Sequence, residues 1–237
     1  MSWRKGPEGP VLRDGEVHVW RLGLDRVPTS AGSELPGLLT PEELSGARRF
    51  RRERDRERWL LARAFLRSVL SRYTAVPARD ITFTQGPYGK PALAGQGPRF
   101  NLAHSDNLAV LALSLDGAIG ADVERLRPLA DLADIAPLVL TPEETRSLRR
   151  LEGPDAARVF ISAWVRKEAL AKAVGAGLHL PLARVSIPLE TPASVLLEPG
   201  CEGGGRVWWV RDLPLGPGWA GALATARPVE AVRLWDY

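Results

Sequence analysis

Two carboxylates stand two residues apart in the segment Gly120-Ala-Asp122-Val-Glu124. On a β-strand, side chains two residues apart project from the same face, roughly 7 Å apart, so Asp122 and Glu124 share one space. The apolar Ala121 and Val123 then face the opposite side. Two acids placed in this way repel each other unless a cation lies between them, and ligation by oxygen alone favours Mg²⁺. Taken alone, the motif also fits a solvent-facing strand with its acids on the wet side.

A second candidate is the helical segment that contains Trp164, Glu168 and Lys172. Their spacing of four residues places them on one stripe of a helix. The simpler interpretation is a surface ion pair between Glu168 and Lys172, worth roughly a few tenths of a kcal/mol. However, the tryptophan stands in a helix rich in Ala, Leu and Val, and two of the four lysines of the chain, Lys167 and Lys172, fall within six residues. This composition favours a helix face turned toward a partly buried polar site.

A third candidate is His104, at the end of the expected strand Phe100-Asn101-Leu-Ala-His104-Ser. It is one of three histidines, and Asn101 is one of two asparagines. Polar residues where a strand gives way to a loop are often functional. A lone histidine is also commonly a satisfied structural residue, so both interpretations stay open.

Seven arginines lie between Arg48 and Arg58, interleaved with Glu53, Asp55 and Glu57. A nucleic-acid-binding patch is one interpretation of this run. Because the acids can pair with the arginines along the helix, a solvated face is the favoured one. Arg58 is different, since its spacing to the apolar residues that follow places its guanidinium near the body of the protein.

The composition is that of an ordinary globular protein: 237 residues, 45% hydrophobic and 25% charged, enough for one large domain or two small ones. A single cysteine, Cys201, excludes an internal disulfide framework and a multi-cysteine zinc site. The N-terminus lacks a hydrophobic signal, and no apolar run approaches a membrane span, so we expect a cytoplasmic protein. Because arginine supplies most of the positive charge, a lysine is expected to do something that the rigid guanidinium group of arginine cannot. The alternative is that the lysines stand where they do by chance.

These side chains must be positioned by an α+β fold. We expect an edge strand at residues 17–22, a helix from a Thr-Pro-Glu-Glu cap near residue 40 to about residue 73, and a hairpin in which Asp116-Gly117 joins residues 108–115 to residues 118–124. Further strands are expected at residues 81–84 and 99–103. In the second half, they are expected at residues 185–187, 207–210, 221–226 and 232–234.

The two halves of the chain echo each other. Leu39-Thr-Pro-Glu-Glu43 recurs as Leu140-Thr-Pro-Glu-Glu144, at an offset of 101 residues, and each copy leads into a short helix and then a long one. Thr-Pro-Glu-Glu is also a common helix opener, which is the alternative explanation. The similar order of the following elements favours two related α+β halves in one compact unit, residues 1–116 and residues 117–237.

Taken together, the motifs resemble those of the 4′-phosphopantetheinyl transferases, over about residues 40–190. They are, in order, Gly89-Lys90-Pro91, Phe100-Asn-Leu-Ala-His104-Ser, Gly120-Ala-Asp122-Val-Glu124 and Trp164-Val-Arg-Lys167-Glu168-Ala-Leu-Ala-Lys172, with Gly177-Leu-His-Leu-Pro181 behind them. Their order suits the large monomeric type named for its surfactin-synthetase activator. The resemblance implies two similar α/β subdomains related by a pseudo-two-fold axis, with the active site in the cleft between them.

The resemblance implies a holo-[carrier protein] synthase. Such an enzyme transfers the 4′-phosphopantetheine group of coenzyme A to a serine of an apo acyl or peptidyl carrier protein and releases 3′,5′-ADP. Asp122, Glu124 and Glu168 would ligate Mg²⁺, or Mn²⁺. Catalysis would depend on Asp122, on Glu168 as the base for the serine proton, and on Lys172 at the leaving diphosphate oxygen. The residues implied to bind coenzyme A are Arg58, Gly89, Lys90, Pro91, Asn101, His104 and Lys172.

The sequence departs from the family pattern at two places. Ala103 stands before the histidine where a serine is common, which puts one hydroxyl contact to phosphate in doubt. Lysines that some members carry on the first helix are absent, and Arg48, Arg49, Arg51 or Arg52 would have to replace them.

The resemblance also sets the expected partners. The acceptor is an acidic carrier protein of fatty acid, polyketide or non-ribosomal peptide synthesis, which suits a chain of net charge +4. We expect a monomer that binds neither nucleic acid nor membrane. A nucleic-acid-binding module and a metal-dependent phosphohydrolase are the alternatives.

Overall fold

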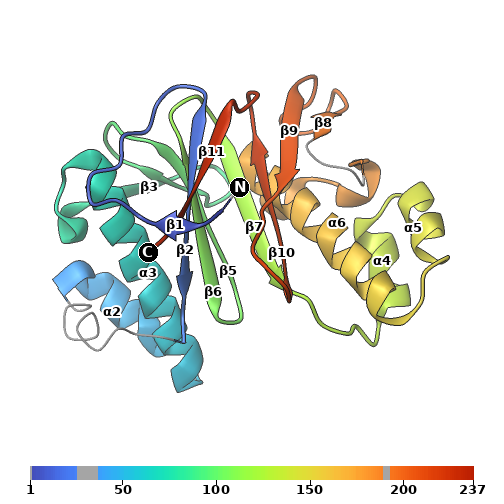
Figure 1. Cartoon of the computed structure of the whole chain (residues 1–237), viewed down its shortest axis with the longest axis horizontal. Helices are drawn as coiled ribbons and strands as arrows, with labels where there is room; N and C mark the ends of the chain where they lie inside the picture. The colour runs from blue at the N-terminus through green and yellow to red at the C-terminus, as the bar shows by residue number, and fades with distance from the viewer. Residues whose placement is uncertain (1, 26–36, 189–192) are drawn as a thin grey trace.

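Two β-sheets form the centre of the fold, with a long helix on the outside of each (Figure 1). This computed structural model describes residues 2–25, 37–188 and 193–237. The first sheet contains, in spatial order, β1 (Arg4–Lys5), β11 (Ala231–Asp236), β2 (Glu16–Gly23), β6 (Leu108–Ser114) and β5 (Arg99–Ser105). The second contains β7 (Ile119–Arg125), β10 (Trp219–Thr225), β9 (Val207–Asp212) and β8 (Ala193–Leu196). A separate hairpin pairs β3 (Phe83–Gln85) with β4 (Pro91–Leu93).

The two long helices are α3 (Glu53–Thr74) in the first half and α6 (Gly153–Val174) in the second. The shorter helices are α2 (Pro41–Gly46), α4 (Leu132–Val139) and α5 (Pro142–Leu148), with 3₁₀ turns η1 (Ala47–Arg49), η2 (Ala78–Asp80), η3 (Gly177–His179) and η4 (Leu182–Arg184). In the part of the chain that the structure describes, no helix has both the length and the apolar character that a membrane span requires.

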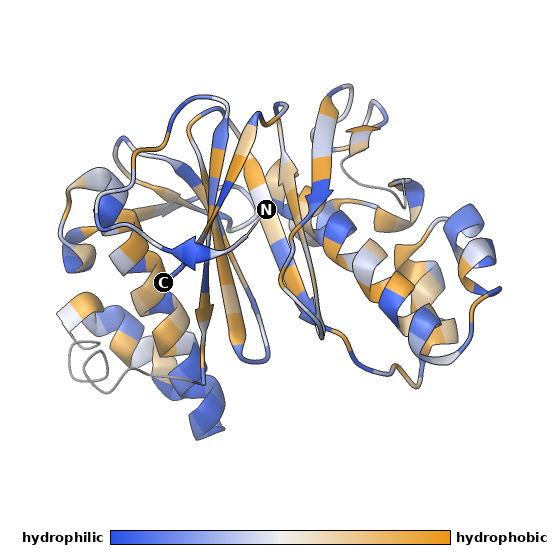
Figure 2. Cartoon of the chain, viewed as in Figure 1, coloured by the Kyte–Doolittle hydropathy of each residue, from blue (hydrophilic) through white to orange (hydrophobic). Residues whose placement is uncertain are grey.

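Apolar faces explain how these layers assemble. Leu66 of α3 is buried with Leu111 of β6, and Leu170 of α6 is buried with Val210 of β9. A third cluster lies between the sheets, where Val110 packs in the same group as Val123. Figure 2 shows the largely hydrophobic strands and, by contrast, the hydrophilic start of α3. The fold is therefore one continuous body, with its core in three adjoining layers.

The predicted repeat of helix openers is present in the structure. Thr40 and Glu43 form a complete capping box at α2, and Thr141 and Glu144 form another at α5. The predicted α+β fold of two similar halves is confirmed, and so are the expected strands of the first half and the helical stretch that ends near residue 73.

Each capping-box glutamate also meets a buried cation from the long helix of its half. Arg67 of α3 donates to Glu43 at 2.7 Å and to backbone carbonyls of the segment after α3. Lys167 of α6 donates to Glu144 at 2.5 Å and to the carbonyls of Val139 and Leu182 at 2.9 and 3.1 Å. Each cation thus fixes a short helix and a loop against a long helix.

Three expectations about strands differ from the structure. Residues 185–187 follow η4 without forming a strand. The strand expected at the edge, β2, lies between β11 and β6, because the C-terminal strand returns to pair with it in parallel. The hairpin expected at Asp116-Gly117 is wrong, because β6 has β2 on one edge and β5 on the other and offers no edge to β7. Instead, the Asp116 carboxylate accepts a hydrogen bond from the Gly15 amide, and the chain crosses to the second sheet.

The division into residues 1–116 and residues 117–237 stays a prediction. Strand β11 does not follow this division. Its residues 231–236 lie in the second segment of the sequence but pair with strands of the first sheet. The C-terminal strand therefore ties the two halves together.

The buried cation of the second half gives a test of this framework. Replacing Lys167 with Met removes the ammonium that compensates the Glu144 carboxylate and donates to the Val139 carbonyl, and we expect a loss of about 3 kcal/mol in the free energy of unfolding. The measurement is urea denaturation followed by circular dichroism. The double variant Lys167→Met with Glu144→Gln should recover part of that loss, since the unpaired charge is gone. Equal stability of the single variant and the parent protein would contradict this role.

Candidate active site

The site begins where α6 lies directly on β7. Gly120 has no side chain, and a Cβ there would overlap the Ala169 carbonyl oxygen and the Ala173 amide of the helix. The strand alternates, so Asp122 and Glu124 share the face of Gly120 that meets α6. The opposite face, with Ala121 and Val123, is buried between the sheets. The predicted orientation of this strand is therefore the one observed.

Asp122 and Lys172 form the central ion pair. Lys172 Nζ lies 2.6 Å from Asp122 Oδ1, and the Asp122 side chain is only 8% exposed. Burial raises the pKa of Asp122 to about 6, although the Lys172 ammonium opposes this shift. The negative charges of Glu124 and Glu168 also raise this pKa. The strand and the helix thus place one cation among three carboxylates.

Glu168 and Glu124 complete what we call the acidic cluster, defined as Asp122, Glu124 and Glu168. The pKa of Glu168 is raised by burial and by the charge of Glu124, while Lys172 lowers it. Ser105, at the end of β5, donates a hydrogen bond to Glu124 Oε2 at 2.6 Å. The sequence motif contained Ser105, but its role as a partner of Glu124 depends on how β5 lies beside β7, which the sequence did not give.

His104 stands next to this cluster as an exposed residue. Desolvation by the surrounding protein lowers its pKa, the Lys172 ammonium lowers it further, and Glu124 opposes both effects. His104 and Lys172 therefore place hydrogen-bond donors beside the three carboxylates. Five predicted residues from β5, β7 and α6 are brought together: His104, Asp122, Glu124, Glu168 and Lys172.

The other predicted ligands have different surroundings. Arg58 makes ion pairs at 2.9 Å with both Asp25 and Asp106, and Asp106 occupies the turn after β5 with φ of 46°. These contacts hold Arg58 near the His104 end of β5. Among its neighbours on α3, Arg54 also contacts Asp25 and Arg56 contacts Glu53. Acids thus compensate Arg54, Arg56 and Arg58, which is the pairing expected for a solvated face.

Asn101 and Lys90 bridge the two halves. Asn101 Oδ1 accepts a hydrogen bond of 2.8 Å from the Ala121 amide, and the side chain is buried. Lys90 lies in the turn between β3 and β4, beside Gly89 and Pro91, and its ammonium donates to the Ile119 carbonyl at 2.8 Å. Burial lowers the pKa of Lys90 to about 8, with a smaller contribution from the positive charge of Arg99.

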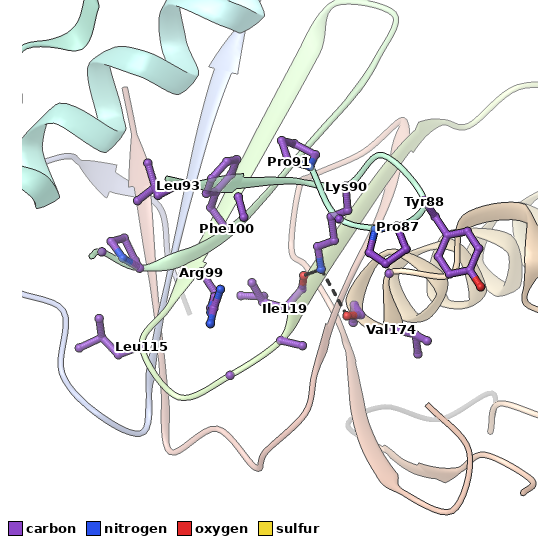
Figure 3. A pocket seen from close by; sticks show the side chains of 18 of the residues that line it. Pro87, Tyr88, Lys90, Pro91, Leu93, Arg99, Phe100, Leu115, Ile119 and Val174 are labelled. Carbon is purple, nitrogen blue, oxygen red and sulfur yellow. Dashed lines mark hydrogen bonds between the residues drawn. The ribbon is translucent and has the colours of Figure 1, made fainter. Parts of the chain in front are cut away.

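A cavity of about 760 Å³ opens beside this turn (Figure 3). Its walls come from both halves, and include Lys90, Leu93 and Arg99 from the first and Val174 from the second. No member of the acidic cluster is among its lining residues. This cavity and the charged site are therefore two separate features of the boundary between the halves.

The acidic cluster offers carboxylate oxygens alone, and these are the ligands that hard divalent cations prefer. Burial raises the pKa of Asp122 and Glu168, and the neighbouring carboxylate charges add to this shift with a repulsion that a bound cation would relieve. Within the described residues, no three acidic, histidine or cysteine side chains are gathered closely enough to form a ready-made metal site. Lys172 stands at Asp122 in this arrangement.

Comparison with known sequences identifies the family. The sequence pattern of the 4′-phosphopantetheinyl transferase superfamily matches residues 118–224, and that of a 4′-phosphopantetheinyl transferase N-terminal region matches residues 32–116. The 4′-phosphopantetheinyl transferase HetI of Nostoc is 34% identical over 241 residues, covering 100% of this chain and 98% of its own. The chain belongs to the 4′-phosphopantetheinyl transferase superfamily.

Two further relatives support the same assignment. The putative 4′-phosphopantetheinyl transferase slr0495 of Synechocystis is 34% identical over 84% of this chain and 80% of its own. The 4′-phosphopantetheinyl transferase Sfp of Bacillus subtilis is 29% identical over 90% of this chain and 93% of its own. The protein is thus an enzyme of the 4′-phosphopantetheinyl transferase class, as the sequence motifs predicted.

The ion pair of this transferase can be tested by titration. We expect the carboxyl carbon of Asp122 to titrate near pH 6 in ¹³C NMR spectra of protein labelled at aspartate, with its signal assigned by its loss in Asp122→Asn. Lys172→Met should move the midpoint upward, because the ammonium that favours the carboxylate is gone. Lys172→Arg keeps the cation and should leave the midpoint nearly in place. A midpoint near 4 in the parent protein would contradict the burial argument.

Proposed function

We propose that this transferase moves the 4′-phosphopantetheine group of coenzyme A onto a serine hydroxyl of an apo carrier protein. The serine oxygen forms a bond to the β-phosphorus of coenzyme A, the bond between the two phosphates breaks, and 3′,5′-ADP leaves. The observation that carries the proposal is the ion pair of Lys172 with the buried Asp122, beside Glu124 and Glu168. Phosphoryl transfer needs negative charge to be neutralised, and this arrangement supplies one ammonium together with carboxylates that can hold a divalent cation.

The acidic cluster fits a bound divalent cation. Asp122, Glu124 and Glu168 supply oxygen ligands, and the cation we propose is Mg²⁺, with Mn²⁺ as a substitute. When bound, this ion would neutralise charge on the diphosphate of coenzyme A. Ser105 holds one oxygen of Glu124 and leaves its other oxygen available.

The side chains of the chain itself would do the remaining work. Glu168 accepts the proton of the attacking serine, for which its raised pKa is suited. Lys172 moves from Asp122 to the leaving diphosphate oxygen, whose negative charge it stabilises or protonates. His104 donates to a phosphate of coenzyme A.

The remaining contacts of coenzyme A are proposed at its adenosine end. The turn with Gly89 and Pro91 would border the adenosine. Arg58 would bind the 3′-phosphate in place of one of its two aspartate partners. Asn101 and Lys90 were predicted for the same ligand, and in the structure Asn101 Oδ1 and the Lys90 ammonium are bound to backbone. An acidic carrier as acceptor agrees with the net charge of +4.

The test is the intact mass of several apo carrier proteins after incubation with enzyme, coenzyme A and Mg²⁺. We expect a phosphopantetheine adduct with the parent enzyme, and a loss of at least about 100-fold in rate for Asp122→Ala and for Glu168→Gln. Asp155→Asn is the matched control, because Asp155 also lies on α6 but pairs only with the exposed Arg158. Full activity in both site variants would refute the assignment.

A second readout separates the transferase from a phosphohydrolase. Release of 3′,5′-ADP should require the apo carrier, because the serine is the nucleophile. Release from coenzyme A alone, at the same rate and with the same dependence on Asp122, would show hydrolysis instead.

A further inference from the structure

Lys90 reaches across the boundary between the two halves of the molecule. From the turn between β3 and β4, its ammonium donates to the Ile119 carbonyl at 2.8 Å and to the Ala173 carbonyl at 3.3 Å. The dashed lines in Figure 3 mark these contacts at the foot of the turn. The stem of Lys90 also packs close to Gly175, just beyond the helix. One side chain of the first half thus touches the start of β7 and the end of α6.

Both carbonyls lack another partner within their own element. Within the described residues, strand β7 has a strand partner, β10, on one edge only, so the backbone groups on its other edge need donors and acceptors from elsewhere. Ala173 lies in the last turn of α6, where helix carbonyls have no amide ahead of them. A lysine ammonium has three donors on a flexible stem and can serve two such acceptors at once.

The contacts of Lys90 belong to a series on β7. Ile119 is held by Lys90, Gly120 lies against the backbone of α6, and the Ala121 amide is held by Asn101. Asp122 follows directly. Three consecutive residues before the ion pair are therefore fixed, each by a different structural element.

We propose that Lys90 is a positioning residue, which sets the register of α6 on β7 and thereby holds Lys172 at Asp122, rather than a ligand of coenzyme A. This inference rests on the proposed function for its catalytic consequence. The structural claim, that Lys90 sets the register of α6 on β7, depends only on its contacts with the two carbonyls. Burying the ammonium beside Arg99 is unfavourable, and the contacts with Ile119 and Ala173 compensate for it.

The experiment compares Lys90→Met, which keeps the stem and removes the donors, with Lys90→Arg, which keeps a cation able to donate twice. For Lys90→Met we expect the dissociation constant of coenzyme A, measured by calorimetry, to stay within threefold. We expect kcat at saturating coenzyme A to fall at least tenfold, because small displacements of reacting groups are costly. Lys90→Arg should recover most of the kcat. Arg99→Met is the control, and should leave both quantities within twofold.

Amide hydrogen exchange provides a readout that needs no transferase activity. In Lys90→Met, the amides of residues 120–122 and 173–175 should exchange at least tenfold faster, with smaller changes elsewhere. Should Lys90→Met not fold, Lys90→Gln, which is too short to reach both carbonyls, takes its place in both measurements.

Two results would overturn the inference. One is a dissociation constant for coenzyme A that rises tenfold while kcat is unchanged, since Lys90 would then be a ligand. The other is unchanged exchange at β7 and the end of α6. If the parent enzyme modifies no carrier protein, the proposed function fails, and the exchange experiment still decides whether Lys90 sets the register.

Discussion

The contact on which this site depends is the approach of two backbones at Gly120. Strand β7 and helix α6 touch there so closely that the Ala169 carbonyl and the Ala173 amide occupy the space of a side chain. Because the two backbones lie so close, Asp122, the next residue on the same face of β7, reaches Lys172. The distance from Asp122 Oδ1 to Lys172 Nζ is 2.6 Å. A larger residue at position 120 would move the helix away and open that distance. Gly120 therefore lets α6 approach β7 closely, while Asp122 and Glu124 supply the charge.

The duplicated architecture provides a frame, and its second half carries the acidic cluster together with Lys172. Helices α3 and α6 correspond at an offset of 100 residues, and both Arg67 and Lys167 bury a cation against a capping-box glutamate. One position later, Ser68 stands where the second half has Glu168. Arg72 packs over the rings of Trp20 and Tyr237, whereas its counterpart Lys172 pairs with Asp122. The same helix position thus serves packing in one half and the acidic cluster in the other.

Local patterns explain which features could be predicted from the sequence. The capping boxes and the alternation on β7 depend on residues a few positions apart, and both were found as expected. The return of β11 to the first sheet depends on pairing with β2 over more than 200 residues, for which no local pattern exists. The scarce lysines illustrate the same limit. All three motif lysines are engaged in polar contacts, but only Lys172 meets the acidic cluster, while Lys167 holds α5 and Lys90 spans two carbonyls.

The electrostatics of the cluster follow from this placement. Three carboxylates and one ammonium share a poorly solvated space, so the cluster carries an excess of negative charge that burial makes unfavourable. Lys172 compensates Asp122 in the arrangement described here, and Ser105 stabilises Glu124. A divalent cation would take over that compensation and release Lys172 for an incoming diphosphate. The ion pair thus stabilises the buried Asp122 carboxylate, and under the proposed function it would hold the lysine close to the diphosphate.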